Sequence, residues 1–99
     1  MTTPEERQRN LIWGRETLTE LAQDEALPPA WRSEATSLLN DYPPLVRLQQ
    51  TDADGLAALQ DEFVRVLSEA RWFFMRVRSH PSSTDQRRYS LTVVLRHFA

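Results

Sequence analysis

Cysteine and lysine are absent from this chain of 99 residues, and glycine occurs only twice. Without cysteine there is no disulfide framework, no thiolate nucleophile and no thiolate metal site. Two glycines are too few for a phosphate-cradling loop, and no serine has the Gly-x-Ser-x-Gly context of a hydrolase nucleophile. We therefore expect a protein that is not an enzyme and that uses no cofactor or metal.

Long apolar runs are also missing. No stretch approaches the length that spans a bilayer, and the charged N-terminus lacks the apolar region of a signal peptide. These observations predict a cytoplasmic protein with no membrane partner. A content of 40% apolar and 9% aromatic residues suffices for one modest core, so we expect residues 1–99 to form a single domain.

What the sequence does contain is an uneven distribution of charge. Residues 1–55 hold five Arg against ten Asp and Glu, whereas residues 56–99 hold seven Arg against four. The net charge of −2 therefore conceals an acidic half and a basic half. The two halves could pair with each other, within one chain or between chains, through surface ion pairs that are individually weak.

Apolar residues at helical spacing predict two helices in the acidic half. The first begins at Thr3, a helix-capping residue followed by proline, and runs to about Gln23. The second spans 29–41 between two Pro-Pro pairs, and we expect the two helices to form a hairpin. Gly14 lies on the buried face of the first helix, where its small size would let another helix approach closely.

The strongest periodicity lies in residues 52–78, which follow a short connector over 45–50. Apolar residues recur there at alternating steps of three and four, the pattern of a heptad seam. They are Leu56, Leu59, Phe63, Val66, Ala70, Phe73 and Val77. We expect one unbroken helix of about 40 Å.

The second half of this long helix extends beyond what the first two helices would cover. It should expose an apolar strip unless the C-terminal helix or another subunit packs on it. The strip comprises Trp72, Phe73, Phe74 and Val77. We therefore expect a homodimer, or a partner protein that covers this strip.

The C-terminal segment fits two structures. One face of a helix would carry Leu91, Val94, Leu95 and Phe98, whereas strict alternation from Tyr89 to Leu95 fits a strand. A strand would pair in a β-hairpin over 71–78 and 88–96, which gives an α+β fold. Because the heptads assign 71–78 to a helix, we favour an all-α fold. In this small helical bundle the N-terminal hairpin packs on the long third helix, and a short C-terminal helix follows.

Residues 1–43 combine an opening helix, an Asp-x-x-Leu-Pro break and a second helix that ends in Leu-Leu-x-x-Tyr-Pro. In this pattern they resemble a family of short, uncharacterised bacterial proteins. The resemblance implies a small helical bacterial protein, and it carries over no functional residues. The matching residues are Thr3, Glu6, Arg7, Arg9, Arg15, Glu16, Leu18, Leu21, Asp24, Leu27, Pro28, Arg32, Glu34, Ala35, Leu38, Leu39, Tyr42 and Pro43.

Arginine and aromatic residues gather in the second half, where Arg76 is placed to stack on Trp72 one helical turn away. Arginine and tryptophan are enriched at the hot spots of protein interfaces. We therefore predict a non-catalytic protein–protein interaction module, with a small regulator or inhibitor as one form of it. The predicted partner-binding residues are Trp72, Arg76, Arg78, Arg87 and Arg88.

Two alternatives remain for this surface. Nucleic acid could bind there through phosphate contacts and base stacking, although the negative net charge weighs against it. A purely structural homo-oligomer is the second alternative.

Other residues that could carry chemistry fit ordinary structural positions. Glu16 and Glu20, one turn apart, are typical of a solvated helix face. Residues 50–61 resemble part of a calcium loop but lack its acidic first ligand and its final glutamate, so they are interpreted as a helix start. His80 and His97 have no acidic residue nearby in the sequence.

Overall fold

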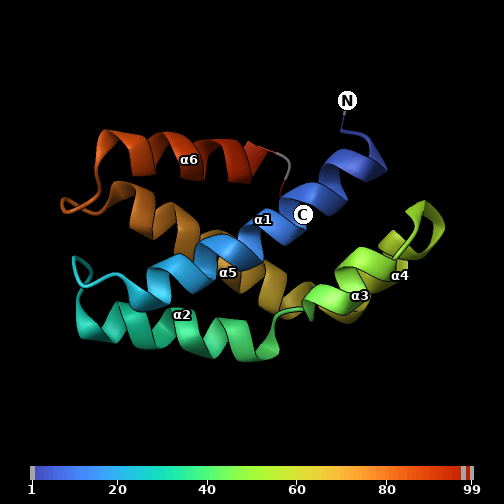
Figure 1. Cartoon of the computed structure of the whole chain (residues 1–99), viewed down its shortest axis with the longest axis horizontal. Coiled ribbons are helices and arrows are strands. Elements are labelled where there is room, and N and C mark those ends of the chain that lie inside the picture. The colour runs from blue at the N-terminus through green and yellow to red at the C-terminus, as the bar shows by residue number, and fades with distance from the viewer. Residues whose placement is uncertain (1, 97, 99) are drawn as a thin grey trace.

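The computed structural model describes residues 2–96 and 98, and these residues form six helices and no strand. Figure 1 shows α1 crossing in front of α5, with α2 along one long edge and α6 along the other. The all-α prediction is confirmed, and the alternative β-hairpin over 71–78 and 88–96 is wrong because both segments are helical. The helices are α1 Pro4–Gln23, α2 Pro29–Asp41, α3 Leu45–Gln50, α4 Ala53–Glu62, α5 Val64–Ser79 and α6 Asp85–Arg96.

Capping side chains explain where three of the helices begin. Thr3, Asp52 and Thr84 each accept a hydrogen bond from the amide three residues later, at 3.1, 2.7 and 3.1 Å. Each bond satisfies an amide that the first helical turn leaves unpaired. The predicted bounds of the first two helices are confirmed, and α1 packs on α2 as the expected hairpin.

The predicted unbroken helix over 52–78 is wrong, because the chain bends at Phe63. This residue separates α4 from α5 and has φ −106° and ψ 18°. No glycine or proline lies between residues 56 and 80, so the usual sequence signals of a kink are missing. The bend has a tertiary cause: α4 packs on α1, whereas α5 packs on α2 and α6. If α4 and α5 formed one straight helix, either α4 or α5 would lose contact with these neighbours.

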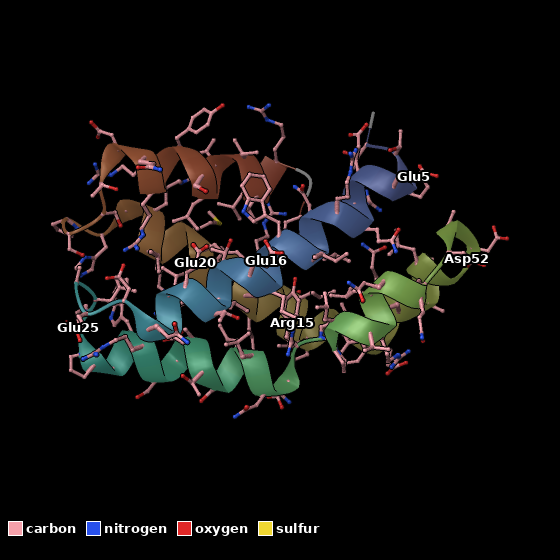
Figure 2. The ribbon with its side chains drawn as sticks, in the orientation of Figure 1. Glu5, Arg15, Glu16, Glu20, Glu25 and Asp52 are labelled. Carbon is pink, nitrogen blue, oxygen red and sulfur yellow. The ribbon has the colours of Figure 1, made fainter. Side chains whose placement is uncertain are left out.

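Polar side chains of α1 hydrogen-bond to the ends of three other helices. Gln8 donates to two carbonyls at the end of α3, at 2.6 and 2.9 Å. The buried amide of Asn10 donates to two carbonyls in the last turn of α6, at 3.0 and 3.3 Å. Arg15 reaches from α1 to the carbonyl of Pro43 just beyond α2, at 3.2 Å (Figure 2). These bonds satisfy carbonyls that helix ends leave unpaired and hold the three helices against α1.

Gly14 lies where α1 meets two aromatic side chains. A Cβ atom at Gly14 would lie 2.7 Å from Phe98 Cε2 and 2.7 Å from the hydroxyl oxygen of Tyr42. That hydroxyl donates to the Leu11 carbonyl at 2.6 Å, and burial raises the pKa of Tyr42, which keeps the donor protonated. The ring of Phe98 stands edge-on to Phe74, with centroids 5.5 Å apart. Gly14 is therefore closely packed, but two aromatic side chains occupy the space where we predicted another helix.

Most of the predicted apolar strip is covered by the chain itself. Phe73, Phe74 and Val77 are 0% exposed. Trp31 of α2 packs on Phe73, and α6 covers α5 from the other side. Within the strip only Trp72 remains open to solvent, at 64%. A strip that the chain itself covers does not require a second subunit. The homodimer therefore stays a prediction. Each of the six helices contributes at least one side chain to one hydrophobic cluster.

Replacing Gly14 with alanine should destabilise the fold, even though alanine favours a helix over glycine by about 1 kcal/mol. The methyl group must displace Phe98 or Tyr42, and such overpacking should lower the free energy of unfolding by about 1–3 kcal/mol. Gly55→Ala is the matched control. The atom nearest to a Cβ added at Gly55 is the Asp52 carboxylate oxygen at 3.3 Å, which belongs to an exposed side chain. The stability of this control variant should stay the same or rise. Urea unfolding followed by circular dichroism measures both variants, and equal stabilities would contradict the packing constraint at Gly14.

Candidate functional site

Trp72 lies at a trough between α2 and α5. Two hollows of about 290 and 390 Å³ share Asp41 and Glu69 and so adjoin each other. We call the two together the α2–α5 trough. Its lining includes the buried side chains of Leu38 and Val66, which provide an apolar floor. An exposed indole therefore stands beside an apolar floor on a part of the surface that is hollowed.

The rim of the trough is acidic. Four carboxylates line it, against the guanidinium groups of Arg65 and Arg76. The carboxylates belong to Glu34 and Asp41 on α2, Glu62 at the end of α4 and Glu69 on α5. Trp72 belongs to the basic half of the sequence, but the tertiary structure surrounds it mainly with negative groups.

Arg76 is held against α2. Its guanidinium forms an ion pair with Glu34. It also lies 5.7 Å from the ring centroid of Trp31 and 5.4 Å from that of Phe73, within the range of cation–π attraction. The predicted stacking on Trp72 is therefore wrong for this arginine: the rings it covers are those at the α2–α5 contact.

The other rim carboxylates differ in how they are neutralised. Arg47 of α3 forms an ion pair with Glu62, and its hydrogen bonds lower the pKa of that carboxyl. Glu69 accepts from Arg65 at 3.3 Å, but the Arg65 side chain is 91% exposed, so this pair is weak. The rim thus offers a poorly neutralised carboxylate at Glu69.

Asp41 is the rim carboxylate whose negative charge is least neutralised by nearby groups. Among the described residues it forms no ion pair, and the last turn of α2, which Asp41 ends, contains no basic residue. The negative end of a helix dipole favours cations, so a carboxylate there is unfavourable. Arg15 reaches the same region, but its guanidinium donates to the carbonyl of Pro43.

The five predicted partner-binding residues do not all meet at this trough. Trp72 and Arg76 line it. Arg78 is two residues beyond Arg76, or about 200° around α5, and so points away from α2. Arg87 and Arg88 lie in the first turn of α6, and neither lines the trough.

Arg87 ties α6 to the end of α1. Its guanidinium pairs with Asp24, which also accepts from the amide of Ala26 at 2.8 Å. That backbone hydrogen bond, and then the contacts with Arg87, lower the pKa of Asp24 despite its partial burial. Arg88 pairs with Asp85 at 3.2 Å. The pairs of Arg87 with Asp24 and of Arg76 with Glu34 confirm that the acidic and basic halves form ion pairs within one chain.

The remaining candidates occupy structural or solvated positions. Glu16 and Glu20 lie exposed on α1 (Figure 2), and the described residues contain no group of three or more His, Asp or Glu that could hold a metal. Asp52 caps α4, as a helix start over 50–61 predicts. His80 Nδ1 accepts from the Ser82 amide at 3.0 Å. His97 lies outside the described residues. None of the helices in the described part of the chain has the length and apolarity to cross a membrane.

No protein-family model matches the chain, and no significant match is found among curated proteins or solved structures. The resemblance of residues 1–43 to a bacterial family therefore stays a prediction. The sequence predicted that Trp72 and Arg76 share a surface, and they line one hollow, but it did not predict Glu34, Asp41 and Glu69 as their neighbours. Two of these carboxylates lie on another helix, so no local pattern could have joined them to Trp72.

The Asp24–Arg87 contact predicts how stability depends on pH. The pKa of Asp24 in the folded state lies below its ordinary value of 3.8. The ionised carboxylate therefore stabilises the fold above that value, and its contribution is lost as the pH falls through the lowered pKa.

Asp24→Asn tests this dependence, because the amide oxygen can still accept from Ala26 but carries no charge. We expect the variant to be less stable than the wild type by about 1 kcal/mol at neutral pH. The difference should shrink toward zero as the pH falls below the lowered pKa of Asp24. Urea unfolding over a pH series measures it, and a difference that persists in acid would show that charge is not its cause.

Proposed function

We propose that this protein is a non-catalytic protein-binding module that uses the α2–α5 trough as its contact surface. The exposure of Trp72 carries the proposal. Its neighbours Phe73 and Phe74 on α5 are fully buried, whereas Trp72 is 64% exposed beside an apolar floor. Leaving such a side chain in water forgoes about 2–3 kcal/mol of burial, and tryptophan is among the residues most enriched at interface hot spots.

The trough is suited to binding without chemistry. Its arginines Arg65 and Arg76 already bond to carboxylates of this chain, so they orient the rim. A small regulator or inhibitor acts in this way, by occupying the surface of another protein. We place Trp72 at the centre of the contact and Arg76 at its edge, and we leave Arg78, Arg87 and Arg88 outside it.

The nucleic-acid alternative has less support at this surface. A phosphate backbone that approached Trp72 would meet three carboxylates in the hollow that this side chain lines, those of Glu34, Asp41 and Glu69. Arg76, Arg87 and Arg88 each pair with a carboxylate of this chain. Binding driven by counterion release needs cations that are available to phosphates, so these pairs weigh against it.

Substitution of Trp72 tests the proposed surface. Trp72→Ala should reduce capture of the native partner by at least about 30-fold, the effect of a hot-spot residue worth about 2 kcal/mol. The fold should remain intact, because an exposed side chain contributes little to the core. The double variant Trp72→Ala/Arg76→Ala should bind no better than the single variant. The matched control is Tyr89→Ala, since Tyr89 is 73% exposed on α6 and lies outside the trough.

The measurement is affinity purification from the native cell with all four proteins, followed by identification of the retained proteins and nucleic acids. Circular dichroism verifies that each variant is folded. A protein retained by the wild type and by Tyr89→Ala but lost from Trp72→Ala supports the proposal. Equal retention by Trp72→Ala would remove the trough from consideration, and retention of nucleic acid alone would favour the alternative.

A further inference from the structure

We infer that the α2–α5 trough receives a cationic amphipathic helix of a partner protein. This inference rests on the proposed function and specifies the chemistry of the partner. The apolar face of that helix would pack on Trp72 and Leu38, and a lysine or arginine at its edge would reach Asp41.

The form of the trough suits a helix. It follows α5 from Arg65 to Arg76, a length of about 17 Å at 1.5 Å per residue, or about three helical turns. Buried apolar side chains line its floor and charged groups line its rim, which complements the apolar stripe and polar edges of an amphipathic helix. A peptide that binds by strand addition would need a sheet edge to pair with, and the described residues contain no strand.

The rim selects a basic partner. Four carboxylates line the trough against two guanidinium groups, and Arg47 from outside the lining neutralises one of the four, Glu62. Arg76 is committed to Glu34 and to the rings beneath it. The highly exposed Arg65 holds Glu69 only weakly, so an incoming cation can compete for Glu69.

Asp41 provides a separate indication of a cation. It carries a negative charge at the negative end of α2, without an ion pair among the described residues. A carboxylate at that position interacts unfavourably with the helix dipole. A basic side chain from a partner would neutralise Asp41 and would also interact favourably with the helix end.

A second copy of this chain is a poorer occupant. Two copies that met trough to trough across a two-fold axis would bring the same acidic rim from both sides. Juxtaposed like charges disfavour such a contact.

Two synthetic peptides of about three helical turns test the inference. Both carry leucines on one face, and the polar face carries lysine in one peptide and glutamate in the other. Isothermal titration calorimetry measures the binding of each to the full-length protein. We expect the lysine peptide to bind and the glutamate peptide not to bind. Affinity for the lysine peptide should fall about tenfold in Asp41→Asn/Glu69→Gln and at least as much in Trp72→Ala.

The control for general attraction to carboxylates is Glu16→Gln/Glu20→Gln. It removes two exposed negative charges from α1, outside the trough. The affinity of this variant for the lysine peptide should stay within about twofold of the wild type, as expected for charges remote from the contact.

The outcomes separate this inference from the proposed function. Three outcomes overturn the cationic helix. The lysine peptide does not bind, the two peptides bind equally, or the two charge-neutralised variants weaken binding of the lysine peptide to the same extent. The proposed function then still stands if Trp72→Ala loses the native partner. A dimer in solution that Trp72→Ala dissociates would make the occupant a second copy and would also overturn the inference. Unchanged capture and unchanged peptide affinity in Trp72→Ala would overturn both.

Discussion

The hydrogen bonds from α1 to the ends of its neighbours are the constraint on which this arrangement of helices depends. Hydrophobic burial favours compactness but does not by itself determine how far one helix slides along another. The amides of Gln8 and Asn10 and the guanidinium of Arg15 meet carbonyls of α3, α6 and the segment after α2. A buried amide left without an acceptor would cost about 1–3 kcal/mol, so sliding α6 along α1 is penalised at Asn10. Gly14 adds a steric condition, because it admits Tyr42 and Phe98.

That arrangement determines what α5 buries and what it leaves in water. Because α2 and α6 are held on opposite sides of α1, α5 packs between them, behind α1 (Figure 1). Phe73, Phe74 and Val77 then lie inside, while Trp72 lies on the remaining side. The bend at Phe63 follows from the same positions, since α4 must turn to reach α1. The trough is thus a consequence of how the core is assembled.

Folding also decides which charged side chains lie next to one another. The basic half of the chain loses much of its positive character because Arg76 and Arg87 pair with Glu34 and Asp24 from the acidic half. Such pairs contribute little stability individually. Their larger effect is on the surface, because the indole of Trp72, which lies in the arginine-rich half of the sequence, stands next to a rim in which carboxylates predominate.

The sequence by itself determined α1, α2 and the start of α4, because the helix ends there depend on local chemistry. Thr3, Asp52 and the Pro-Pro pairs act within a few residues, and the three-and-four spacing of apolar residues identifies the buried face. At Gly14 the sequence indicated close packing but not its partners, because Tyr42 and Phe98 lie far from it in the chain. Only the tertiary structure decided that the chain bends at Phe63, that Phe73 and Phe74 are covered, and that Asp41 lies near Glu69. These features depend on which helices meet, and residues far apart in the chain leave no local pattern that records their contact.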